Sequence, residues 1–246
     1  MATPYKLLCG LEPLRTGNYT IQLQAGCAAV STPGTDYLIE FNDRYTIDIR
    51  IFGVGGRDYA GALVQGWHYI WLLYNSTTGE SAVIASMGEL GGGLNIPAGF
   101  THIRKLNSFA FYYTPGNIQN YVFVGWPNPY IAHTLADNGS GYRALLDGTA
   151  TAWTSVTFGG GLMAPSARLV RVQAVLEYIS ASGSGYIRTP GLGSGLLVGT
   201  VSAAATKQRE FIHDLAVSSD QRLEYKVTAG VKLSLYALGH HIQETY

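Results

Sequence analysis

Charged residues are scarce in this chain of 246 residues. They make up 13% of the sequence, about half of the roughly 25% that is typical of soluble globular domains. The 16 basic and 16 acidic residues cancel, and no run of Lys or Arg is longer than two. Nucleic-acid binding needs a basic field to offset phosphate charge, so we expect no nucleic-acid partner. A low-charge surface also indicates that much of it faces other protein, as in an obligate oligomer.

Long apolar runs and cysteines are scarce too. The longest apolar run, residues 69–74, is far shorter than the roughly 20 residues that cross a bilayer, so no membrane span is expected. The amino terminus has no basic segment followed by an apolar one, which predicts synthesis in the cytoplasm without a secretory signal. Cys9 and Cys27 are the only cysteines. In a reducing cytosol we expect them to be small buried thiols rather than a disulfide.

The sequence contains no recognisable catalytic or metal-binding pattern. The aspartates are scattered, and the glycine runs lack the Lys-Ser/Thr that completes a phosphate loop. His240 and His241 are adjacent, so on a strand their rings point to opposite faces and do not chelate one ion within a chain. One histidine per subunit around a threefold axis is the remaining alternative. We expect no enzyme activity, no cofactor and no metal.

Apolar and polar residues alternate with a period of two along most of the chain. This alternation predicts strands with one buried face, and it is clearest over residues 19–24, 45–51, 170–178 and 223–228. Ala229-Gly230 joins the last of these to another alternating run and predicts a hairpin. The expected fold class is all-β: an antiparallel β-sandwich, jelly-roll-like.

Glycine-rich and proline-rich clusters separate the expected strands. They lie at residues 114–117, 137–141, 159–161 and 182–185, and we interpret each as a turn. None is long enough for a flexible linker, so the sequence favours an N-terminal arm over residues 1–17 and a single sandwich domain over residues 18–246. A boundary near residues 137–148 is the alternative.

The abundant aromatic residues, 12% of the chain, divide into two candidate sets. Trp67, Tyr69 and Trp71 lie in a segment that is apolar on both faces, which favours a place in the core or in a subunit interface. Trp126, Asn128 and Tyr130 lie in a stretch where two prolines disfavour a central strand. The 125–130 segment is therefore a candidate recognition loop, because loops on rigid scaffolds commonly carry binding residues.

The region of residues 67–105 contains a motif of strand, turn and second strand. An aromatic strand ends in Tyr-Asn-Ser-Thr-Thr-Gly at residues 74–79, and Ile-Pro-Ala-Gly-Phe-Thr-His-Ile-Arg-Lys follows from Ile96. This block resembles a module of bacteriophage tail-fibre and related virion proteins. Phe100 stands where that module usually has Tyr, Lys105 replaces its second Arg, and the closing Gly-Tyr is here Gly239-His240.

The resemblance implies a virion structural protein. It implies a tail-fibre or related appendage module, acting in host attachment, that is made in the host cytoplasm and resides in the virion. The homotrimer expected for such proteins rests on this resemblance alone. Other virion proteins and a host cell-surface glycan or receptor are the expected partners. Two alternatives remain open: a capsid decoration or head-fibre protein, and a carbohydrate-binding, lectin-like module.

Overall fold

Antiparallel β-strands form the regular structure of the chain. The computed structural model describes residues 8–11, 13–32, 35–88, 93–119, 121–124, 130–133, 142–204 and 207–242. Within these ranges, each pair of strands whose register is described runs antiparallel, which confirms the all-β sandwich class. In the same ranges no helix is long or apolar enough to cross a bilayer.

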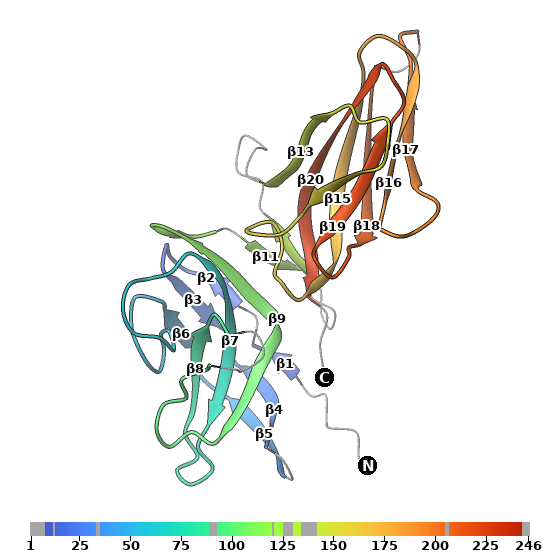
Figure 1. Cartoon of the computed structure of the whole chain (residues 1–246). Helices are drawn as coiled ribbons and strands as arrows, with labels where there is room; N and C mark the ends of the chain where they lie inside the picture. Colours follow the sequence, from blue (N-terminus) through green and yellow to red (C-terminus); the bar gives the residue numbers. More distant parts are fainter. Residues whose placement is uncertain are drawn as a thin grey trace. The chain divides into compact units, whose positions relative to one another are not determined.

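The strands gather into two compact units, which are described separately (Figure 1). Unit 1 comprises Met1–Phe123 with Thr245–Tyr246, and unit 2 comprises Val124–Glu244. The division at Phe123 differs from the single domain favoured by the sequence and precedes the alternative boundary at 137–148. The domain assignment made from the sequence stays a prediction.

Unit 1 contains a seven-stranded sheet and a three-stranded sheet. The larger sheet has the order β1-β4-β9-β7-β8, with β5 beside β4 and β10 beside β9; the smaller has the order β2-β3-β6. Part of the expected N-terminal arm is therefore built into sheets as β1 and β2. The strands are β1 (Leu8–Gly10), β2 (Pro13–Arg15), β3 (Thr20–Leu23), β4 (Gly26–Thr32), β5 (Thr35–Phe41), β6 (Tyr45–Asp48), β7 (Gly66–Tyr74), β8 (Ser81–Ser86), β9 (His102–Thr114) and β10 (Asn117–Ile118).

Strand β7 is buried on both faces, as its apolar sequence indicates. Trp67, Tyr69 and Trp71 are exposed by 6%, 1% and 6%. β7 and β8 form a hairpin in register from Tyr74 opposite Ser81. The Asn75 side chain closes the turn by accepting hydrogen bonds from the backbone N–H groups of the two threonines that follow it, at 2.9 and 3.2 Å.

The outer edge of β8 is covered by the loop that follows β6. Backbone N–H groups at positions 55 and 58 donate to carbonyls of β8, and Ala85 N–H donates back to Gly56. Arg57 holds this loop from inside, because its buried guanidinium donates to the carbonyls of Ile49 and Gly61. A long unpaired edge strand is prone to pair with other chains, and this loop removes that edge.

Cys27 corrects one expectation from the sequence. It is disulfide-bonded, and Cys9 is the only other cysteine in the chain. The register of β1 against β4 places the two residues directly opposite each other. The cytosolic argument for free thiols was therefore wrong: a residue-by-residue register that the sequence does not reveal brings the two cysteines together.

Unit 2 is a sandwich of a six-stranded and a four-stranded sheet. The six-stranded sheet has the order β11-β12-β20-β15-β18 with β13 beside β20, and the four-stranded sheet has the order β14-β19-β16-β17 (Figure 1). Apolar side chains from both sheets form one buried core. The strands are β11 (Tyr121–Val124), which spans the division between the units at Phe123, β12 (Tyr130–His133), β13 (Arg143–Gly148), β14 (Thr154–Thr157), β15 (Ala167–Tyr178), β16 (Gly183–Arg188), β17 (Leu196–Val201), β18 (Gln208–Ala216), β19 (Arg222–Val227) and β20 (Val231–Ile242).

Two segments that the sequence predicts as a turn and a hairpin have different structures. Residues 183–185 belong to β16. A Cβ on Gly183 would clash with the Thr228 hydroxyl, and one on Gly185 would lie 2.7 Å from a Leu176 methyl. These glycines allow close packing rather than a turn.

The link at Gly230 joins β19 in one sheet to β20 in the other, so it is a connection between the two sheets and not a hairpin. Its carbonyl accepts backbone N–H groups from residues 179–181, which fixes this connection.

Replacing Trp71 tests the core of unit 1. Trp71→Ala should lower the free energy of unfolding by roughly 3–5 kcal/mol, because it leaves a cavity between buried strands. Trp71→Phe should cost much less, since the indole N–H of Trp71 is buried without an acceptor among the described residues. Urea denaturation followed by circular dichroism measures both, and an unchanged midpoint for the alanine variant would contradict the burial.

His68 makes unit 1 sensitive to mild acid. Its Nδ1 lies 3.1 Å from the Gly66 carbonyl and its Nε2 lies 2.9 Å from the Tyr59 hydroxyl, which fits a neutral ring that donates to Gly66 and accepts from Tyr59. Burial lowers the pKa of His68 to about 4; the Gly66 hydrogen bond opposes this shift and the charge of Arg57 adds to it.

The stability of unit 1 should therefore fall between pH 6.5 and pH 4. Above about pH 6.5 His68 is neutral in both states and contributes no loss. Below it the unfolded chain binds a proton that the folded chain does not, so unfolding becomes easier by a total of about 3 kcal/mol near pH 4. Denaturation of His68→Gln across this range should show a flatter dependence. Equal slopes for the variant and the natural chain would refute the assignment to His68.

Candidate functional site: an aromatic and cationic sheet face

The recognition loop expected from the sequence lies mostly outside the described residues. Trp126 and Asn128 are both outside them, and Tyr130 is described only as the first residue of β12. The assignment of this loop stays a prediction. The second candidate set, Trp67, Tyr69 and Trp71, lies inside unit 1 and presents no ring surface to a ligand. Among the described residues, the candidate binding site is therefore a different aromatic surface.

The outer face of the four-stranded sheet in unit 2 carries aromatic and charged side chains. In β19 the residues Leu223, Tyr225 and Val227 are buried, so the residues between them point outward. In β16, Tyr186 and Arg188 are likewise outward on either side of buried Ile187. The register places Tyr186 opposite Lys226 and Arg188 opposite Glu224. Two cations, a carboxylate and a phenol ring thus share one face.

Trp153 completes this face at the start of β14. The next residue, Thr154, pairs with Tyr225, which brings Trp153 beside Lys226. The Arg188 guanidinium carbon lies 4.1 Å from the centroid of the Trp153 ring, and the Lys226 ammonium lies 4.8 Å from it. Both distances are within the range of favourable cation–π contact. The indole is held in place by these cations while remaining partly exposed.

Gly195 provides the space that Trp153 occupies. A Cβ at this position would lie 2.3 Å from Cη2 of the indole. Any larger residue would therefore push against the ring. Glycine is required here because the indole ring approaches the backbone closely, and not because of the backbone conformation.

Arg188 is fixed by bonds on both sides. Its Nε donates to Oε2 of Glu224 at 2.7 Å, and the two side chains are only 17% and 21% exposed. Its Nη1 also lies 3.4 Å from the Gly193 carbonyl. A partly buried, charge-assisted pair of this kind is held more firmly than an exposed one. Glu224 and the backbone therefore hold the Arg188 guanidinium in place against Trp153.

We define the aromatic–cationic face as Trp153, Tyr186, Arg188, Glu224 and Lys226. Aromatic rings offer flat apolar surfaces, and the charged groups offer hydrogen-bond donors and acceptors beside them. Sugars have the complementary chemistry, with C–H faces and hydroxyl edges. This arrangement can hold a sugar chain against the sheet.

The described residues contain no cluster of three metal-ligating side chains. His240 and His241 lie in β20, outside the aromatic–cationic face. The ring Nε2 of His240 accepts a hydrogen bond from the backbone N–H of Ala164 at 3.2 Å. This nitrogen is therefore hydrogen-bonded within unit 2 rather than to a ligand.

Comparison with known proteins gives little guidance. No family model matches the chain, and no curated protein matches it either. One similar solved structure is a point mutant of a family 29 carbohydrate-binding module, CBM29-2. It is 12% identical, with 54% of this chain and 74% of that chain covered, at a TM-score of 0.22. A likeness at this level establishes neither a common fold nor a common ligand.

Substitution at Gly195 should disturb the face without unfolding unit 2. Gly195→Ala should displace the Trp153 ring from Arg188 and change the tryptophan fluorescence and its quenching by acrylamide. Gly193→Ala is the matched control, because a Cβ there meets nothing within 4 Å. If both variants give the spectrum of the natural chain, the close contact between Gly195 and Trp153 is wrong.

Proposed function

We propose that the chain is a binding module that holds a glycan on the aromatic–cationic face of unit 2. The observation that carries the proposal is that Trp153 and Tyr186 are both partly exposed on one sheet, on either side of a lysine. Aromatic side chains with polar partners are the groups that dominate binding energy at recognition surfaces. A rigid sheet presents them with little loss of entropy on binding.

The setting we propose for this activity is a bacteriophage virion. The tail-fibre resemblance of residues 67–105 in unit 1 supports an appendage module that acts in host attachment. In this proposal unit 2 meets a host cell-surface glycan, and unit 1 belongs to the part that joins other virion proteins or further copies of the chain. The homotrimer remains part of the proposal and is supported by the same resemblance alone; the low proportion of charged residues supports an oligomer without specifying a trimer.

Tyr186→Ala should abolish most glycan binding while leaving the fold intact. Loss of a stacking ring from a rigid surface costs roughly 2 kcal/mol or more, about thirtyfold in affinity. A glycan array followed by calorimetry on the best ligand measures this effect. The matched control is Tyr236→Ala, because Tyr236 is also partly buried but lies in β20, on the opposite sheet.

The outcome that would refute the glycan proposal is specific. If the natural chain binds no glycan on a broad array, or if Tyr236→Ala weakens binding as much as Tyr186→Ala does, the aromatic–cationic face is not the site. Circular dichroism melts of both variants show whether either loss reflects unfolding. Adsorption assays with particles that carry Tyr186→Ala then test the virion setting separately.

A further inference from the structure

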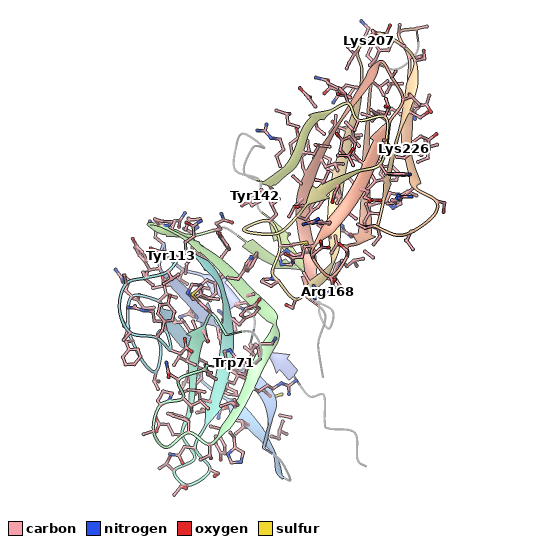
Figure 2. All side chains as sticks on the ribbon, viewed as in Figure 1. Trp71, Tyr113, Tyr142, Arg168, Lys207 and Lys226 are labelled. Atoms are coloured by element: carbon pink, nitrogen blue, oxygen red, sulfur yellow. The ribbon has the colours of Figure 1, made fainter. Side chains whose placement is uncertain are left out.

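Lys226 lies between the two aromatic rings of the aromatic–cationic face. Its ammonium is 4.8 Å from the centroid of Trp153 and 5.4 Å from the centroid of Tyr186. Lys226 is directly opposite Tyr186 in the ladder between β19 and β16. Figure 2 labels it on this sheet of unit 2. The charge is therefore central to the face, not at its margin.

Several other cations on the sheets of unit 2 are paired with carboxylates. Arg188 bonds to Glu224, Arg171 to Asp214 in a bidentate pair, and Lys232 to both Asp147 and Glu177. Arg222 pairs with Asp220. Lys226 forms no ion pair with any described residue, and its contacts are with the two rings. Because the Arg188 and Glu224 charges cancel, Lys226 leaves the face with an excess of positive charge.

Its contacts with both rings place the Lys226 ammonium where a sugar chain bound to those rings would pass. The ammonium lies 4.8 Å from the centroid of the Trp153 ring and 5.4 Å from that of the Tyr186 ring, so the two centroids are at most about 10 Å apart. That separation is on the scale of a short oligosaccharide. A sugar chain that contacts both rings passes close to Lys226, and a carboxylate on it would meet the ammonium.

We infer that the ligand of this face is an acidic oligosaccharide whose carboxylate pairs with Lys226. The inference rests on the proposed glycan-binding function and adds the chemical class of the glycan. A carboxylate bound here gains a charge-assisted hydrogen bond that a neutral sugar does not. The rings on either side displace water from the pair and strengthen it.

The test compares sugars that differ only in charge. Oligogalacturonate and its methyl ester have the same rings and hydroxyls, and sialyllactose and its carboxyl methyl ester form a second pair. For at least one of the two pairs, the natural chain should bind the acidic member roughly tenfold more tightly than the neutral member. A hydrogen bond to a charged group contributes about this much to affinity. This preference should shrink as salt rises.

Lys226→Met should remove the preference while keeping the binding of the neutral member. Lys207→Met is the matched control, because Lys207 is an exposed lysine at the far end of unit 2 (Figure 2) and its loss should leave the preference intact. Melting curves of both variants show whether the fold is retained.

The outcomes separate the two levels of the proposal. Binding of neutral sugars with equal strength, or an acidic preference that survives Lys226→Met, would overturn the acidic ligand while leaving the glycan-binding function in place. Binding of neither member of any pair, nor of any sugar on the array, would overturn both. Loss of folding in Lys226→Met would be checked with Lys226→Arg, which keeps the charge and should keep the preference.

Discussion

The structure of the candidate site depends on the burial of one face of strands β16 and β19. Leu223, Tyr225, Val227 and Ile187 are at most 5% exposed and pack into the core between the two sheets of unit 2. Because successive residues of a strand point to opposite faces, this burial forces Glu224, Lys226, Tyr186 and Arg188 outward in a fixed register. A slip by one residue would bury these charges and expose the core, so the hydrophobic effect determines where the polar groups stand.

Two local features then adapt this face for recognition. The Arg188–Glu224 pair fixes a guanidinium that stacks on Trp153, and Gly195 leaves room for the indole ring. Such preorganisation lowers the entropy that binding would otherwise cost. By contrast, the outer face of the six-stranded sheet carries paired charges, including Arg171 with Asp214 and Lys232 with Glu177. Those charges satisfy one another, whereas the aromatic–cationic face has a lysine that no described carboxylate neutralises, beside partly exposed rings.

Much of the fold, but little of the site, could be predicted from the sequence. Alternation reveals which side chains of a segment share a face, so the strands around residues 170–178 and 223–228 and the burial of β7 follow from it. It does not reveal which strand is the neighbour. Trp153 does not lie in a segment of alternating apolar and polar residues, and β16 begins with glycines that resemble a turn. The disulfide of Cys27 depends on the register between two strands. The link at Gly230 was misread because a short turn can join two sheets as well as two strands of one sheet. The proposed attachment role rests on the motif in residues 67–105, which concerns unit 1 and gives no information on this face.

The most direct test of the account is an NMR titration of the isotopically labelled chain with the tightest glycan from the array. Binding on the aromatic–cationic face should shift amide resonances of β16, β19 and the start of β14, together with the indole N–H of Trp153. Amides of β15 and β18, in the opposite sheet, should move little. Shifts confined to the 125–130 segment, or to the strands of unit 1, would contradict the account and return recognition to the loop that the sequence favoured.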